Sequence, residues 1–350
     1  MNRPTMLVAA VLTALSACSA VGGPGSGTGQ EDASGGTVVL VTHESFSVSK
    51  TLLADFEKSS GMNVDIRQPG DAGTLVNQLV LTKDAPIGDV VYGIDTTFAS
   101  RAMDEGVLAP YESPALPAAV DDLLVDDSHL LSPVDYGDVC INADLEWFAE
   151  HDLAVPASLE DLTDPAYENL LVVSNPATSS PGLAFLMATV AAFGEDGWLG
   201  YWEQLRDNGV KVANGWSDAY YTDFSGSDGE GPRPLVLSYA SSPPSEVSGG
   251  KATTSALLDT CFRQVEYAGV IDGAANPDGA QEVVDFLLSP QFQRDLPRRM
   301  YVYPTDPEAP LPADWKRFAP VPPDPYRLEA EQIDANRSRW VQEWTDTVVG

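Results

Sequence analysis

The sequence is short of positive charge. It has 19 Lys and Arg residues against 52 Asp and Glu residues, which gives a formal net charge of −33 at pH 7. Nucleic-acid binding depends on a basic surface that neutralises phosphates, so we exclude nucleic acid as a partner. A negative surface keeps a secreted protein in solution and also attracts cationic ligands.

The sequence has no hydrophobic run long enough for a permanent transmembrane helix. Its longest apolar stretch extends only from Met6 to Ala17, whereas crossing the hydrocarbon layer takes about 20 residues. We expect residues 1–17 to be a signal peptide. Leu15-Ser16-Ala17-Cys18 matches a bacterial lipobox, which predicts lipidation of Cys18; an ordinary secretory peptide with an incidental cysteine is the alternative.

The segment that follows the lipobox, residues 18–36, is rich in Gly and Ser and has no apolar periodicity. Such a composition is typical of a flexible tether. The mature protein is therefore expected on the extracytoplasmic face of the cell membrane, held there by its lipid anchor.

Histidine and cysteine are scarce, at three residues each. No spacing among them is typical of a metal site, so we expect no bound metal and no cofactor. Once Cys18 is assigned to lipidation, Cys140 and Cys261 remain as a pair in an oxidising compartment. Either a disulfide or two buried free thiols fits the sequence at this point.

The remaining chain reads as two lobes of an α/β fold. Residues 37–350 exceed the usual size of a single core, and strand and helix patterns alternate, as in doubly wound sheets with ligand loops at the carboxyl ends of the strands. The expected strands are Thr37–Thr42, Asn63–Arg67, Asp89–Gly93, Val139–Asn142, Leu170–Ser174, Leu235–Tyr239 and Cys261–Ala268. The expected helices are Val48–Ser59, Gly73–Thr82, Gly182–Phe193, Trp198–Asp207 and Leu328–Val349, with a Pro-rich loop at Tyr303–Pro325.

The order of these elements predicts a discontinuous first lobe. We place lobe 1 at residues 37–135 and lobe 2 at residues 136–265. Residues 266–350 then return to lobe 1 and add the C-terminal loop and helix.

Aromatic, hydroxyl and acidic side chains follow the expected strands. Helix-opening hydroxyl groups and free backbone N–H groups bind anions or polar edges, and Trp and Tyr offer flat apolar faces with a polar tip. Taken singly, Asp71 and Ser179 also fit helix caps, and Trp216 also fits a core residue. Their joint placement after strand ends predicts a binding site.

Several blocks make the chain resemble the bacterial thiamine-binding proteins of ABC importers, from about Val39 to Trp344. The blocks are Asp-Tyr-Gly at 135–137, TSSPGL at 178–183, GWSDAY at 215–220, LSYASSP at 237–243, SPQFQ at 289–293 and Tyr-Pro at 303–304. The resemblance implies a two-lobed periplasmic-binding-protein-like fold whose cleft closes over thiamine or its phosphates, and a binding protein with no enzymatic activity. It also implies delivery of the ligand to an ABC permease and its ATPase; we expect a monomer.

By motif, the resemblance assigns ligand contacts to ten positions: Ser45, Asp71, Asp95, Asp135, Tyr136, Ser179, Trp216, Tyr220, Tyr239 and Tyr301. Three positions depart from the family. His43-Glu44-Ser45-Phe46 stands where the family commonly has Tyr-Asp-Ser-Phe, Ser245 stands where a stacking Tyr is expected, and Tyr301 replaces a Trp. These departures bear on the choice among thiamine, its phosphates and a related pyrimidine.

The chemistry of thiamine agrees with the residues. Its thiazolium ring is a permanent cation, which aromatic faces attract and which a carboxylate such as Asp95 or Asp135 would neutralise. The tandem Tyr220-Tyr221 favours ferric iron as an alternative cargo. An extracellular hydrolase with Ser217 or Ser179 as nucleophile is a remote alternative, because the chain has no Gly-x-Ser-x-Gly elbow and no histidine placed to serve it.

Overall fold

The computed structural model describes residues 36–117, 120–229 and 231–350. The predicted signal peptide, the lipidation site at Cys18 and nearly all of the tether lie outside the described residues. Within them, no helix combines the length and the apolar character needed to cross a bilayer.

Strands and helices alternate through the first part of the chain, and longer connections follow. The strands are β1 (Thr37–Thr42), β2 (Asn63–Arg67), β3 (Val90–Asp95), β4 (Leu108–Ala109), β5 (Ser132–Asp144), β6 (Leu171–Ser174), β7 (Lys211–Ala213), β8 (Leu235–Tyr239), β9 (Val247–Ser248), β10 (Lys251–Ala252), β11 (Thr254–Ala256), β12 (Phe262–Ile271) and β13 (Tyr303–Pro304). The helices are α1 (Lys50–Ser60), α2 (Ala72–Leu81), α3 (Ala99–Asp104), α4 (Leu145–Glu150), α5 (Ser180–Asp207), α6 (Trp216–Asp218), α7 (Pro277–Leu287), α8 (Pro290–Arg299), α9 (Trp315–Phe318) and α10 (Ala330–Trp344).

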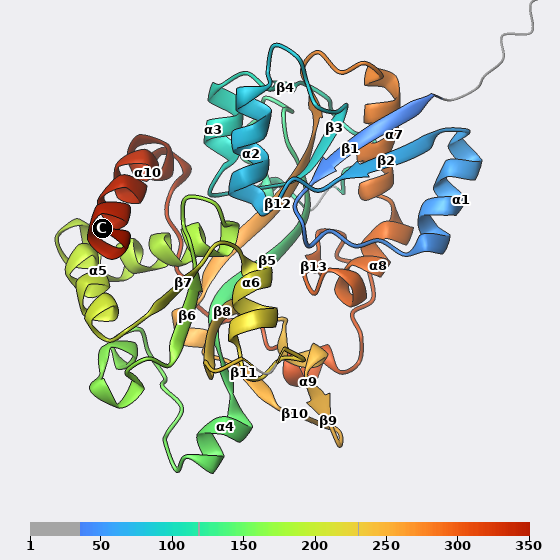
Figure 1. Ribbon diagram of the computed structural model, residues 1–350. Coiled ribbons are helices and arrows are strands. Elements are labelled where there is room, and N and C mark those ends of the chain that lie inside the picture. Colours follow the sequence, from blue (N-terminus) through green and yellow to red (C-terminus); the bar gives the residue numbers. More distant parts are fainter. Residues whose placement is uncertain (1–35, 118–119, 230) are drawn as a thin grey trace, which may run out of the picture. The chain divides into compact units, whose positions relative to one another are not determined.

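One mixed sheet connects most strands, in the order β2-β1-β3-β12-β5-β8-β6-β7. Its two ends are parallel, since β1 pairs in parallel with β2 and β3, and β6 pairs in parallel with β7 and β8. In its middle, β5 and β12 run antiparallel and form a long ribbon that continues into both ends (Figure 1). The predicted α/β class is confirmed, with helices on a sheet of mostly buried strands.

The ribbon contains the positions where we placed the lobe boundaries. Tyr136 pairs with Val265, Asp135 pairs with Glu266, and the register shifts between Glu266 and Tyr267. The two predicted boundaries therefore meet across one pair of hydrogen-bonded strands. The assignment of residues to lobes stays a prediction.

Two expected elements differ from the structure. The helices expected on either side of residue 195 form one element, α5, interrupted at Gly194, whose φ of 67° and ψ of 176° are not helical. The Pro-rich segment expected to be only a loop contains β13 and α9, because Trp315 of α9 is buried and packs edge-on against Tyr303 with ring centroids 5.0 Å apart. A large side chain in a Pro-rich segment thus anchors a helical turn.

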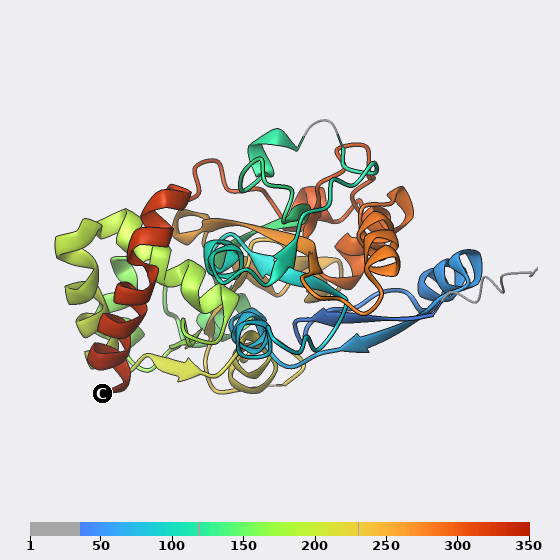
Figure 2. The same ribbon diagram turned by 90° about the horizontal axis from the view of Figure 1, so that it is seen from above.

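The C-terminal helix is a core element. Ile333, Trp340 and Trp344 of α10 are buried, as expected from their spacing. Trp344 meets Trp202 of α5 edge-on, with ring centroids 5.5 Å apart, and Figure 2 shows α10 lying along α5.

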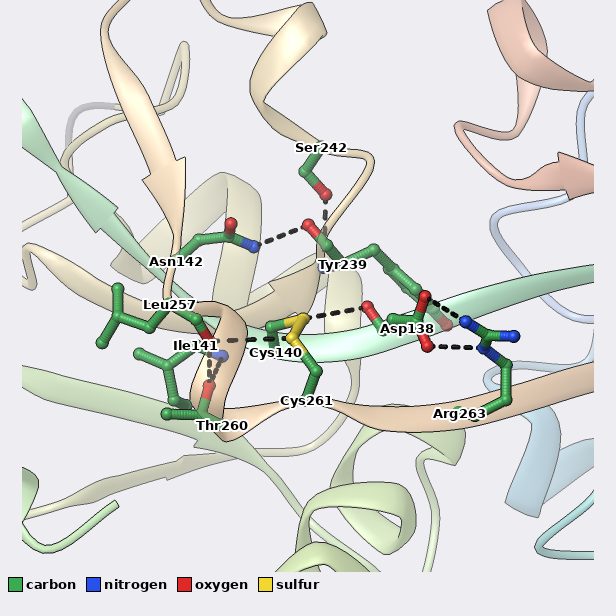
Figure 3. The surroundings of a disulfide bond; sticks show 10 residues. All are labelled: Asp138, Cys140, Ile141, Asn142, Tyr239, Ser242, Leu257, Thr260, Cys261 and Arg263. Carbon is green, nitrogen blue, oxygen red and sulfur yellow. Dashed lines mark hydrogen bonds and ion pairs between the residues drawn. A yellow bond between two sulfur atoms is a disulfide. The ribbon is translucent and has the colours of Figure 1, made fainter. Parts of the chain in front are cut away.

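A disulfide joins Cys140 of β5 to Cys261, which directly precedes β12 (Figure 3). Both residues are buried, and the next residue pair on the ribbon is Val139 with Phe262. Beside the bridge, Arg263 forms a bidentate ion pair with Asp138, with N–O distances of 2.5 and 3.0 Å. The bridge and the ion pair both connect β5 to β12.

Candidate functional site

A cavity of about 430 Å³ lies where several strand ends and helix starts meet. The loop after β1, the starts of α2, α5 and α6, the loop after β8, and the segment before β13 contribute to its wall. Small-molecule sites have volumes of roughly 300–1,000 Å³. The cavity therefore fits one small ligand.

One side of the cavity is an aromatic wall formed by Trp216, Tyr220 and Tyr221. Trp216 and Tyr220 are stacked with ring centroids 4.9 Å apart, and Tyr221 meets both edge-on at 5.5 and 5.3 Å. The Trp216 indole N–H donates to the Ser238 hydroxyl at 3.0 Å, and the Tyr220 hydroxyl donates to Glu246 at 3.2 Å. These bonds fix the orientation of the Trp216 and Tyr220 rings.

The cavity lining is strongly acidic. It contains five carboxylate side chains, one arginine and one histidine: Glu44, Asp71, Asp228, Glu246, Glu266, Arg299 and His43. Aromatic faces attract cations through their negative π surface. The wall and the carboxylates together favour a flat cationic ligand.

Asp71 joins three helix starts at the edge of the cavity. Its Oδ1 accepts from the backbone N–H groups of Ala72 at 2.7 Å and Ser180 at 3.1 Å, and its Oδ2 accepts from the N–H of Trp216 at 3.0 Å. These residues begin α2, α5 and α6. One carboxylate therefore satisfies free donors at three helix N-termini and fixes the aromatic wall relative to the other side of the cavity.

A buried acidic cluster lies beneath the cavity floor. The Tyr92 hydroxyl contacts Asp135 at 2.5 Å and Glu266 at 3.3 Å. Burial, followed by the negative charge of Glu266, raises the pKa of Asp135 well above its usual value. Burial also opposes ionisation of Glu266, but the His43 ring beside it and hydrogen bonds from its neighbours lower its pKa overall. Within this pair the proton favours Asp135 and the negative charge favours Glu266, which lines the cavity.

Comparison with known proteins identifies the family. The family model described as "Bacterial extracellular solute-binding protein" matches residues 85–326. The chain belongs to this family. It is a solute-binding protein and not an enzyme.

Two named relatives cover most of the solute-binding protein. The thiamine-binding periplasmic protein of Brucella suis is 28% identical over 317 residues, which span 88% of this chain and 91% of the relative. The protein of the same description from Escherichia coli K12 is 26% identical over 318 residues, spanning 89% of this chain and 93% of the relative.

Solved structures confirm the periplasmic-binding-protein fold. A periplasmic thiamin binding protein superposes with a TM-score of 0.78 at 25% identity, covering 89% of this chain and 96% of that chain. The ferric binding protein from Campylobacter jejuni superposes with a TM-score of 0.70 at 17% identity, covering 89% and 99%. The second comparison shows a shared fold alone.

The structure brings six of the ten expected ligand residues to the cavity. These are Ser45, Asp71, Trp216, Tyr220, Tyr239 and Tyr301. The other four, which are Asp95, Asp135, Tyr136 and Ser179, are not part of its lining.

Asp95 and Ser179 lie directly behind the lining at the start of α5. Asp95 is fully buried and accepts hydrogen bonds from Thr97 and from the hydroxyl of Ser180. Burial is the main cause that raises the pKa of Asp95 to about 7. Ser179 accepts from the N–H of Gly182 and caps α5, so its neighbour Ser180 is the hydroxyl residue that reaches the cavity.

Asp135 and Tyr136 lie on β5, away from the cavity surface. Asp135 belongs to the buried cluster with Tyr92. Tyr136 stacks on Tyr303 at 5.3 Å, and Arg263 lies over its ring at 5.1 Å. The third residue of that motif, Gly137, serves the site indirectly, because a Cβ there would lie 2.9 Å from the ring of Tyr239.

Tyr301 adopts a backbone conformation that is rare for a bulky residue. Its φ is 54°, in the left-handed region, which costs about 1–2 kcal/mol for a residue with a Cβ. Its carbonyl accepts a hydrogen bond from the Ser241 hydroxyl, in the loop after β8. That bond holds the aromatic ring of Tyr301 in the cavity wall across from β8.

The sequence argument missed several lining residues. Glu44, Ser180 and Tyr221 are neighbours of expected residues, so the motifs that named Ser45, Ser179 and Tyr220 pointed to segments that line the cavity. Glu246 and Glu266 had no such signal. Glu266 lies in the middle of β12, where it pairs with Asp135 of β5 on one side and with Asp95 of β3 on the other.

Within the described part of the chain, no group of three or more His, Cys, Asp or Glu side chains is arranged to hold a metal ion. Tyr220 and Tyr221, whose phenol oxygens could bind iron once ionised, also line the cavity. Burial, followed by the charge of Glu246, raises the pKa of both tyrosines, which keeps both phenols protonated at neutral pH.

Proposed function

We propose that this solute-binding protein captures thiamine or a thiamine phosphate outside the cell and delivers it to an ABC-type importer. The observation that carries the proposal is an aromatic wall and an acidic lining in one cavity of suitable size. An aromatic face attracts a desolvated cation by about 2 kcal/mol. Thiamine has two flat rings, one of them permanently cationic, and the relatives described as thiamine-binding align over most of this chain.

We assign ligand contacts to the six expected residues that line the cavity. Trp216, Tyr220, Tyr239 and Tyr301 would pack against the rings, while Ser45 and Asp71 offer polar groups. A phosphate ester would lie toward the segment that begins α5, where a helix N-terminus favours negative charge. Asp95 and Ser179 would support that segment from behind.

Delivery to an importer places the protein at the membrane. We propose that Cys18 carries the lipid anchor and that residues 18–36 tether the binding domain to the outer face. The partners would then be the permease and ATPase of the importer.

The test is ligand binding by the purified mature chain. Native mass spectrometry without added ligand should show a bound mass of thiamine or a phosphate ester, and titration calorimetry should give a dissociation constant below about 1 µM, equivalent to roughly −8 kcal/mol. The pyrimidine half of thiamine, which lacks the cationic ring, serves as control and should bind at least tenfold more weakly, a difference of about 1.4 kcal/mol. Equal binding of both compounds would reject the cation argument, and absence of thiamine binding would reject the proposal.

Ferric iron is the second candidate, and one observation favours it: Tyr220 and Tyr221 are adjacent in the cavity wall. Iron binding by two phenolates requires both to lose a proton, against the raised pKa of each. Iron bound to the purified protein with a visible charge-transfer band, lost in Tyr221→Phe, would replace thiamine as the cargo.

A further inference from the structure

His43, at the carboxyl end of β1, is a titratable group in the cavity wall that the proposed function has not used. Its side chain is 8% exposed. The ring lies against Gly93 of β3, where a Cβ would be 2.2 Å from His43 Cδ2. Gly93 also has a φ of +99°, which favours glycine. The fold therefore provides a fitted space for this imidazole.

Hydrogen bonding defines which nitrogen of His43 carries the proton. Nδ1 accepts from the backbone N–H of Ser45 at 3.2 Å. A backbone N–H only donates, so Nδ1 is unprotonated and the neutral ring has its hydrogen on Nε2. Nε2 lies 3.7 Å from Glu266 Oε2, and the ring thus connects the loop after β1 to the charged carboxylate of β12.

The loop that His43 holds is part of the cavity. Phe46 N–H donates to the His43 carbonyl at 3.1 Å, and Glu44 N–H donates to the Gly70 carbonyl at 2.8 Å. Between these bonds, Glu44 and Ser45 turn toward the cavity and line it. A change at His43 Nδ1 therefore acts directly on two lining residues.

Charged and titratable groups face His43 from every neighbouring element. Glu266 comes from β12, Tyr92 and Asp95 from β3, Asp71 from the start of α2, and Glu44 from its own loop. Burial lowers the pKa of His43, but the negative charges, that of Glu266 first, outweigh burial and raise it above the usual value. No lysine or arginine is among these neighbours, so protonation of His43 or a bound cation adds positive charge beside Glu266.

We propose that His43 couples ligand affinity to pH, with its proton and the positive charge of the ligand competing for Glu266. This inference rests on the proposed function, since it requires a cationic ligand. Protonation also places a hydrogen on Nδ1 against the N–H of Ser45, which breaks the bond that orders Glu44 and Ser45. Acidification therefore weakens the site both electrostatically and through the loop.

The direction of the effect follows from linkage. If the ligand binds better beside neutral His43, ligand binding lowers the His43 pKa by the same factor, and a proton is released on binding. Affinity is then highest above the His43 pKa and falls by up to about tenfold for each pH unit below it. A ligand without charge should show a smaller pH dependence, because only the change in the loop remains.

The experiment is titration calorimetry of the full mature chain with thiamine from about pH 6 to about pH 8, in buffers of different ionisation enthalpy. The wild type should bind more weakly at the acid end and release a proton on binding. His43→Gln keeps an amide oxygen that accepts from Ser45 N–H but does not titrate, so its affinity should be nearly constant with pH. His129→Gln removes an exposed histidine and should behave as the wild type. An equal pH slope in His43→Gln, or no slope in the wild type, would overturn the inference.

A second measurement keeps the inference separate from the proposed function. Long-range proton–nitrogen NMR of the three histidines reports the tautomer and titration of His43 without ligand, with the exposed His129 and His151 as internal references. The expected result is a neutral ring protonated at Nε2 that titrates together with the amide resonance of Ser45. If thiamine binds at no pH, the proposed function fails; a His43 that titrates without any change at Ser45 rejects the inference itself.

Discussion

At the scale of single residues, Asp71 is the side chain on which most of the cavity geometry depends. It is half-buried, and its two oxygens accept from three backbone N–H groups on three helices. Gly215 makes this arrangement possible, because a Cβ there would lie 3.3 Å from Asp71 Oδ2. Asp71 is a helix cap and a cavity residue at once, so the two roles considered for it from sequence were not exclusive alternatives.

Replacing Asp71 by Ala should destabilise the protein and weaken thiamine binding together. Three helix-start donors lose their acceptor, which should cost about 2–3 kcal/mol of unfolding free energy. Ser49→Ala is the matched control, because Ser49 caps α1 by accepting from Leu52 N–H and does not line the cavity. The control should lose about 1 kcal/mol of stability with an unchanged dissociation constant. Denaturant unfolding and calorimetry of both variants check this; unchanged binding in Asp71→Ala would show that the site does not depend on this carboxylate.

Trp216 offers a second test at this scale. Its ring is half-buried and stacks on Tyr220. Trp216→Ala should weaken thiamine binding by about 2–4 kcal/mol, the range of an aromatic hot spot. Trp216→Phe keeps a face but loses the bond to Ser238, and should retain most of the affinity.

The alternative role for Trp216 is a packing contact in the core. A core role predicts a stability loss of about 3–5 kcal/mol in Trp216→Ala, with affinity unchanged in the folded fraction. Thermal unfolding measured beside calorimetry separates a ligand contact from a packing contact.

At the scale of elements, the ribbon of β5 and β12 is held by the disulfide between Cys140 and Cys261. The bridge closes a loop with a sequence separation of 121 residues. For a loop of this size the chain-entropy model gives about 4–5 kcal/mol, and measured effects are often smaller.

Thiol counting on the denatured, unreduced protein should find neither Cys140 nor Cys261 free. Replacing both by Ala should lower the unfolding free energy by up to about 4–5 kcal/mol, with thiamine affinity retained, because neither cysteine lines the cavity. Two free thiols per chain would show that the pair only packs.

Much of the element order was readable from the sequence, and the reasons are local. Thr37–Thr42, Asn63–Arg67 and Leu235–Tyr239 coincide with β1, β2 and β8, because short β-branched runs bounded by turn residues predict strands well. The length of β5 was missed. Its first part, Ser132–Asp138, contains Pro, Asp and Gly, which are poor strand formers, and pairing with β12 on one side and β13 on the other holds it extended.

The sequence predicted which loops line the cavity better than it predicted which side chains in those loops face it. Motifs identified the loops after β1 and β8 and the starts of α2 and α5. Within a loop, however, one step along the chain decides whether a side chain faces the cavity or the core, as Ser179 and Ser180 show. Glu266 was not predictable, because its position depends on strand register with Asp135, which is distant in the sequence.

At the scale of the whole molecule, the net charge and the N-terminal segment bear on whether the protein is held at the membrane. The formal net charge of −33 keeps the chain in solution, so a purely electrostatic attachment to anionic lipid is excluded. Under the proposed function, a membrane location is attributed to lipidation of Cys18.

Cys18→Ala should abolish membrane anchoring and leave ligand binding intact, since the residues that line the cavity in the described part of the chain lie at His43 and beyond. Metabolic labelling with a fatty-acid analogue, followed by membrane fractionation, measures anchoring. The purified variant should bind thiamine with the wild-type dissociation constant. If Cys18→Ala still carries the fatty-acid label, Cys18 is not the lipidated residue.

The position of the disulfide on the ribbon also limits the ways in which the chain can misfold. A strand that slips must move by two residues to keep its apolar face inward, a shift of about 7 Å. Such a slip of β12 along β5 would carry Cys261 out of bonding distance of Cys140. Formation of the bond therefore selects the single register in which Glu266 faces Asp135. Oxidation of Cys140 and Cys261 to the disulfide therefore favours the native strand register, on which the binding site depends.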